Sequence, residues 1–273
     1  DPSARRAGPP EPGRPAAQRQ GTVTRAVVDD DRGLRDDVRQ WAGLVTTGAW
    51  AALASVVMIV VQIALYVAWP PPETTVDFFE LLLAHPVRGV IALDVLYIVS
   101  NLLAFLLYLA LAVVLWGVSR SAVVVALAFG VLGMSAYMAS PRAVEMLTLA
   151  HAYREADGAA RVALIATGDG MLATWTGTAF DIYYFFNLAA LLILAVLLLR
   201  SSVVTRTTAL WGLAAAVLMA VPSNFGTVGL AFALASLLPW AVFCVLVARR
   251  LLHLAESATS SAHTDVKRRS VAP

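Results

Sequence analysis

Residues 178–199 read TAFDIYYFFNLAALLILAVLLL, and Asp181 is the only charged residue among them. As an α-helix, at about 1.5 Å per residue, this run would be roughly 33 Å long. That length matches the hydrocarbon layer of a bilayer, which is roughly 30 Å thick. A soluble helix needs a polar face, and the second half of this run has no polar residue. The run therefore predicts a membrane-spanning helix.

Similar apolar runs occur along most of the chain. Of its 273 residues, 59% are hydrophobic and only 14% are charged, and the mean hydropathy is +0.75. A soluble domain of this size cannot bury so much apolar surface. We therefore expect an all-α, polytopic transmembrane bundle of about six spans, at residues 48–69, 90–116, 122–139, 178–199, 208–222 and 227–248.

The remaining segments predict the domain organisation. Residues 1–44 are rich in Pro, Gly, Arg and Asp, and we expect them and residues 255–273 to be disordered tails. Residues 45–254 form the predicted membrane domain. Within it, residues 73–89 and 141–176 mix apolar and charged residues, which is typical of amphipathic helices at a membrane surface.

The arginines near the span ends predict the orientation. One side of the predicted bundle holds Arg32, Arg35, Arg39, Arg120, Arg200, Arg206, Arg249 and Arg250. The other side has fewer arginines, and they lie in longer loops that also carry many acids. Because basic residues favour the cytoplasmic side, both termini are expected to be cytoplasmic.

Two segments resemble each other and suggest an internal repeat. The first carries Asp94, Tyr97 and Asn101, and the second carries Asp181, Tyr184 and Asn187. Spans two and three would form one copy and spans four and five a parallel second copy. Asp94 and Asn101 are seven residues apart but Asp181 and Asn187 only six, so the match needs a slip of one residue.

These six residues are the candidate ligand-binding site. An ionised carboxylate within a span costs at least about 2.5 kcal/mol unless it meets water, a partner or a proton. Asp94 and Asp181 could therefore line an outward-facing polar vestibule together with Tyr97 and Tyr184. Alternatively, they are acids at helix starts, stabilised by the helix dipole, while Asn101 and Asn187 hold helices together.

Several other activities have no support in the sequence. The net charge of +2 gives no basic surface for nucleic acid. The single cysteine, Cys244, excludes an intrachain disulfide. The only lysine is Lys267, outside the predicted spans, and there is no HExxH, GxSxG or Walker A motif. We expect no metal or cofactor, and an enzymatic activity has no visible nucleophile and base.

The C-terminal half resembles a family of bacterial membrane proteins, domain-of-unknown-function family 4386. The resemblance rests on residues 181–187 (DIYYFFN), 209–214 (ALWGLA), 221–229 (VPSNFGTVG) and 238–240 (LPW), and extends over residues 45–254. It implies a multi-helix protein of the bacterial plasma membrane. It implies no activity and assigns no site residues.

Two functions are therefore expected. In the first, the bundle binds or transports a small solute, an ion or a proton through the outward-facing vestibule. In the second, it is a non-catalytic scaffold that packs against lipid and against a membrane protein partner or a second copy of itself.

Overall fold

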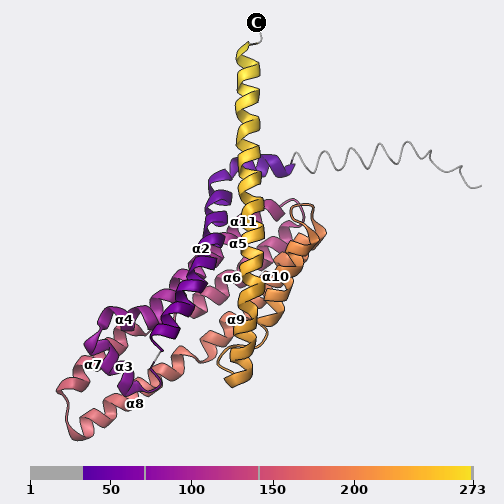
Figure 1. Ribbon diagram of the computed structural model, residues 1–273. Helices are drawn as coiled ribbons and strands as arrows, with labels where there is room; N and C mark the ends of the chain where they lie inside the picture. Colours follow the sequence, from indigo (N-terminus) through magenta and orange to yellow (C-terminus); the bar gives the residue numbers. More distant parts are fainter. Residues whose placement is uncertain (1–32, 71, 141, 272–273) are drawn as a thin grey trace, which may run out of the picture.

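The computed structural model describes residues 33–70, 72–140 and 142–271, and this part of the chain is helical without strands. A helical segment at residues 33–40 precedes the labelled helices (Figure 1). These are α2 (Ala42–Ala68), α3 (Thr75–Ala84), α4 (Pro86–Val90), the π-helical turn η1 (Ile91–Val95), α5 (Leu96–Leu115), α6 (Arg120–Met138), α7 (Ala143–Glu155), α8 (Gly158–Trp175), α9 (Thr178–Arg200), α10 (Arg206–Leu218) and α11 (Gly226–Val271).

The transmembrane bundle predicted from the sequence is confirmed. Five helical stretches are long and apolar enough to cross a membrane, and they contain α2, α5, α6, α9 and α11. The sixth predicted span, residues 208–222, corresponds to α10, which ends at Leu218. Its 13 residues give about 20 Å of helix, so α10 is shorter than a full span.

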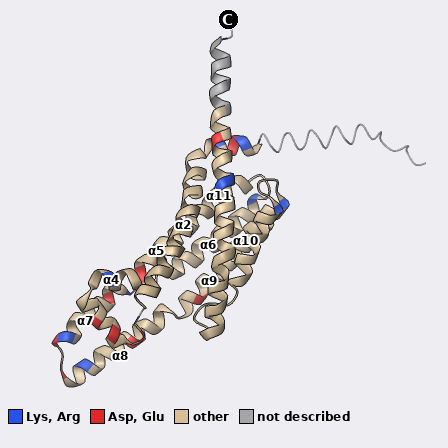
Figure 2. Cartoon of the chain, viewed as in Figure 1, with Lys and Arg blue, Asp and Glu red and all other residues tan. Residues whose placement is uncertain are grey.

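The bundle packs around one apolar core. α6 packs mainly on α9, α2 packs on α5 and α11, and α10 lies against α9 and α11. Leu107, Leu111, Leu191, Leu194 and Phe243 are fully buried there. Charged residues gather at the two ends of the bundle and are rare between them (Figure 2). This distribution is the one expected of a membrane bundle.

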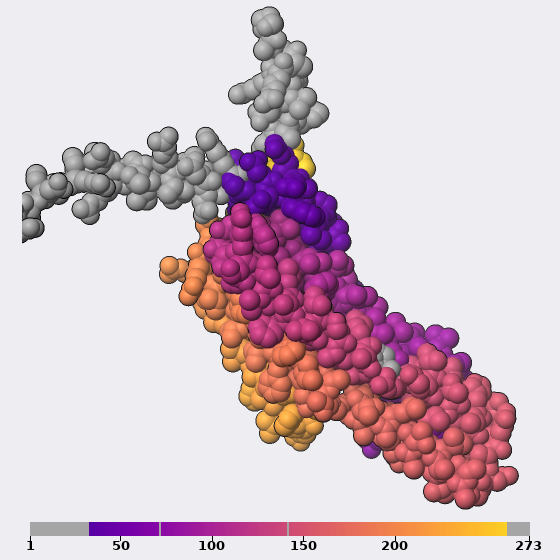
Figure 3. Space-filling view, turned by 180° about the vertical axis from the view of Figure 1, so that it is seen from behind, coloured from indigo at the N-terminus to yellow at the C-terminus, as the bar shows by residue number. Residues whose placement is uncertain are grey.

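A second, smaller core lies at one end of the bundle. α3, α7 and α8 meet there, with Phe79, Leu82 and Met146 fully buried between them. α7 and α8 protrude beyond the bundle (Figure 3). The predicted amphipathic segments 73–89 and 141–176 are thus helical, and they bury their apolar faces largely against each other.

Two predicted tails differ from the structure. Residues 33–44 are helical, and α11 continues to Val271, so residues 255–271 belong to a helix. The reason is local, because residues 255–271 contain neither Gly nor Pro to end the helix. Residues 1–32 and 272–273 of the predicted tails lie outside the described residues. The first described residues and the later part of α11 lie at the same end of the bundle (Figure 1).

Candidate functional site

The candidate site is a cavity of about 360 Å³ between the helices of the bundle. α2, α5, α6, α9, α10 and α11 all contribute lining residues. Four of the six residues singled out from the sequence line this cavity: Tyr97, Asn101, Tyr184 and Asn187. The structure therefore brings together parts of two motifs that are far apart in the chain. The volume lies in the range typical of small-molecule sites.

Tyrosine is the residue type that characterises the cavity. The chain has seven tyrosines, and six of them line it: Tyr66, Tyr97, Tyr108, Tyr137, Tyr183 and Tyr184. Four of the rings form a chain of contacts: the Tyr137 centroid lies 6.0 Å from that of Tyr97 and 5.0 Å from that of Tyr183, which in turn lies 5.6 Å from that of Tyr184. Such a wall offers aromatic faces for packing and hydroxyls for hydrogen bonding.

Some of the hydroxyls are held by protein partners. The Tyr66 hydroxyl donates to the Tyr97 hydroxyl at 2.8 Å, and Gln62 Nε2 donates to Tyr66 at 3.4 Å. The Tyr184 hydroxyl donates to Ser223 Oγ at 3.1 Å. The hydroxyls of Tyr108, Tyr137 and Tyr183 have no hydrogen-bond partner in the part of the chain that the structure describes.

The two asparagines make the same local bond. Asn101 Nδ2 donates to the Tyr97 carbonyl at 2.9 Å, and Asn187 Nδ2 donates to the Tyr183 carbonyl at 3.1 Å. Both side chains are buried, at 3% and 2% exposure. The acceptor Asn101 Oδ1 is buried and has no partner among the described residues. A buried acceptor without a partner costs about 1–3 kcal/mol, so its presence needs an explanation.

Asp94 does not line the cavity. Its carboxylate instead accepts the backbone N–H groups of Arg142 at 3.2 Å and Ala143 at 2.8 Å. These N–H groups are at the start of α7, where no intrahelical acceptor exists for them. Asp94 therefore caps another helix, and with 8% exposure it is buried in that contact. The sequence analysis offered two roles for this acid, a polar vestibule or a helix-start position; in the structure it lies outside the cavity lining and caps α7.

Asp181 also lies outside the lining of the cavity. Its Oδ1 accepts a hydrogen bond from Asn224 Nδ2 at 2.9 Å. The same Nδ2 donates to the Thr176 carbonyl at 2.8 Å. Asp181 thus ties the first turn of α9 to the turn between α10 and α11. Of the six predicted site residues, the tyrosines and asparagines therefore line the cavity, whereas both aspartates lie outside its lining.

The one-residue slip between the two motifs coincides with a local change of helix geometry. Counted from the asparagines, Tyr97 corresponds to Tyr183 rather than to Tyr184, because each carbonyl accepts the asparagine bond. Asp94 then lies one residue further from its asparagine than Asp181 does. Asp94 is part of the π-helical turn Ile91–Val95, which holds one more residue than an α-turn. The parallel repeat itself stays a prediction.

Charge and access define what the cavity can hold. No Asp, Glu, Lys, Arg or His is among the described residues that line it. Three lining residues are apolar and exposed: Ile63 on α2 at 46%, and Leu230 and Leu234 on α11 at 52% and 57%. α2 and α11 separate toward the end of the bundle where α11 begins (Figure 1). The cavity therefore opens sideways, toward the surface that lipid would cover.

Sequence reasoning missed part of the lining, notably Gln62, Tyr66, Tyr108, Tyr137 and Tyr183. A signal was present for Tyr108, which lies well inside the predicted span 90–116, whereas Tyr66, Tyr137 and Tyr183 lie near span ends, where Tyr is common.

Comparison with known proteins gives no further assignment. No family model, no curated protein and no solved structure matches this chain. The resemblance to family 4386 stays a prediction. Within the described residues, no group of three or more His, Cys, Asp or Glu could hold a metal ion.

Proposed function

We propose that this chain is a membrane protein that binds a small, uncharged, hydrogen-bonding molecule in the tyrosine-lined cavity. The observation that carries this proposal is a lining residue, Asn101, whose buried side-chain oxygen, Oδ1, has no hydrogen-bond partner among the described residues. A ligand with an N–H or O–H donor would satisfy it. The aromatic walls would contribute packing, and the three tyrosine hydroxyls without partners would fix the orientation of the ligand.

The absence of charge in the described lining argues against an ion as the ligand. An ion in a cavity without countercharges loses most of its hydration free energy and gains no ion pair. The ion and proton versions of the transport hypothesis relied on Asp94 and Asp181, whose carboxylates bond to protein groups outside the cavity. A neutral solute fits the lining better.

The lateral opening indicates how the ligand reaches the cavity. The exposed Ile63, Leu230 and Leu234 at its edge are all aliphatic, so a molecule that passes them must tolerate an apolar path. We infer that the ligand partitions into the bilayer and enters between α2 and α11. Movement of the ligand to the other side would make the protein a transporter; binding alone would make it a receptor or carrier.

We further propose the bacterial plasma membrane as the location, with both termini cytoplasmic. The distribution of the arginines supports this orientation. The position of both described chain ends at one end of the bundle also supports it (Figure 1).

The test compares the small molecules that copurify with the wild-type protein and with two variants. Full-length protein is reconstituted in lipid nanodiscs, and bound small molecules are identified by mass spectrometry. Asn101→Leu removes the cavity acceptor and should reduce retention of a neutral compound about tenfold. Ser140→Ala is the control, because Ser140 Oγ is also buried without a partner but does not line the cavity.

Equal retention by both variants and the wild type would contradict the site. If no compound is retained by any of the three proteins, the scaffold hypothesis is favoured, in which the polar residues only hold helices together and partner proteins or a second copy bind outside.

A further inference from the structure

A second hollow lies on the surface, where α2 ends beside α4, η1 and α5. It is a groove of about 710 Å³, and it shares only Tyr66 with the tyrosine-lined cavity. Its lining is mainly apolar: Leu65, Tyr66, Trp69, Ala84, His85, Pro86, Val87, Arg88, Ile91, Ala92 and Leu96.

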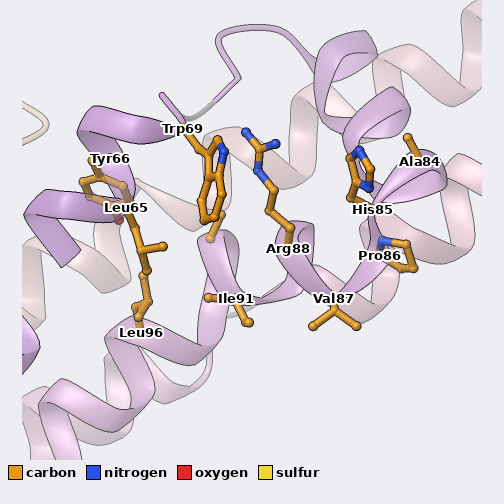
Figure 4. Close-up of a pocket in the computed structure, with 11 residues that line it drawn as sticks. Leu65, Tyr66, Trp69, Ala84, His85, Pro86, Val87, Arg88, Ile91 and Leu96 are labelled. Carbon is orange, nitrogen blue, oxygen red and sulfur yellow. The ribbon is translucent and has the colours of Figure 1, made fainter. Parts of the chain in front are cut away.

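The groove has one charged residue, Arg88. Its guanidinium carbon lies 5.0 Å from the centroid of the Trp69 ring, a cation–π distance. No described carboxylate forms an ion pair with Arg88. Figure 4 shows that the Trp69, Arg88 and His85 side chains lie on the same side of the groove. An anion bound beside Trp69 would meet the Arg88 guanidinium, and His85 lies farther along the same side.

The other side of the groove is aliphatic. Val87, Ile91 and Leu96 lie along it in Figure 4, away from the guanidinium group. These residues belong to a stretch, Pro86–Leu115, that is apolar enough to cross a membrane. Trp69 follows directly on α2, another spanning helix, and tryptophan at a span end favours the membrane interface. The groove thus has a polar end and an apolar wall, and we expect the polar end to lie at the headgroup level of the bilayer.

We propose that this groove binds a membrane phospholipid. The phosphodiester would accept hydrogen bonds from Arg88, whose planar guanidinium suits a phosphate. An acyl chain would cover Leu65, Ile91 and Leu96. A free phosphate would leave these apolar residues uncovered, so the lipid explains both sides of the groove. This inference is independent of the proposed function.

The test uses light-activated cross-linking in a bilayer. The full chain is reconstituted in phosphatidylcholine nanodiscs that contain a trace of phosphatidylglycerol with a diazirine on one acyl chain. After irradiation, the labelled peptides are located by mass spectrometry. The labels should concentrate on residues 65–69 and 87–96.

Three variants distinguish the effect of charge from the effect of shape. Arg88→Gln should reduce the groove label about tenfold, whereas Arg88→Lys, which keeps the charge, should reduce it about twofold. Ile91→Trp fills the groove without changing its charge and should also reduce the label. The matched control is Arg161→Gln, because Arg161 also lies over an aromatic ring, 4.1 Å from Tyr153, but outside the groove.

Labels on peptides outside the groove serve as the folding control, because they should be equal in all four variants. The proposal is overturned if the label is spread evenly over the spanning helices, or if Arg88→Gln and Arg161→Gln reduce the groove label equally. Loss of the groove label on addition of excess inorganic phosphate would also overturn it, in favour of a site for the free anion.

Discussion

Asp94 in η1 and Asp181 on α9 begin similar sequence motifs but have different surroundings. Asp94 is buried and caps α7 through two backbone N–H groups. Asp181 is only half-buried and accepts one side-chain amide from a turn. An acid near the start of a membrane helix is thus not a site in itself, because the segment that packs against it decides its role.

The largest expected effect in this comparison is on stability. Asp94→Ala should leave two N–H groups at the start of α7 without an acceptor. We expect it to lower the free energy of unfolding by about 2 kcal/mol. Asp94→Asn keeps one carbonyl acceptor and should cost about 1 kcal/mol. Equilibrium unfolding in mixed micelles measures both values, and an alanine variant as stable as the wild type would show that the cap is not needed.

The second prediction concerns access of reagents to the surroundings of the two acids. In a Cys244→Ser background, Ser140→Cys places a thiol beside the start of α7, and Thr176→Cys places one beside Asn224. Ser140 is 2% exposed, whereas Thr176 is exposed. N-ethylmaleimide should therefore label position 140 at least about tenfold more slowly in detergent-solubilised protein, as expected for a rigidly packed site. Equal rates would mean that α7 detaches readily.

The third prediction compares the tyrosines of the two motifs. Tyr97 accepts a hydrogen bond from Tyr66 on another spanning helix. The double-mutant cycle of Tyr66→Phe and Tyr97→Phe should give a coupling of about 0.6 kcal/mol, the average for interhelical hydrogen bonds in membranes. Tyr66→Phe with Tyr184→Phe is the control cycle, and it should show no coupling because Tyr184 bonds to Ser223.

The smallest effect is expected at Asp181. Its bond to Asn224 is single and exposed, so Asp181→Ala should lower the free energy of unfolding by about 0.5 kcal/mol. Asn224→Ala also removes the bond to the Thr176 carbonyl, so it should cost somewhat more, and the double variant should cost less than the sum. A loss at Asp181 as large as that at Asp94 would remove the distinction between the two acids.

The sequence identified a substantial part of the candidate site. Tyr97, Asn101, Tyr184 and Asn187 were singled out as polar groups in apolar helices, and all four line the cavity. The two aspartates were assigned to the same site because they begin the same motifs. Asp94 instead bonds to the backbone at the start of α7, and Asp181 bonds to Asn224. Each partner is more than forty residues away in the chain, so no local pattern reveals it.

The sequence by itself determined that the chain is an all-α membrane protein and where its long spans lie. Span length and apolarity are properties of a continuous segment, so they can be read along the chain. Only the tertiary structure decided that six tyrosines meet around one cavity and that α10 is short. It also decided that Asp94 serves another helix. These outcomes depend on which helices pack together, and in apolar sequences many packings bury similar side chains equally well.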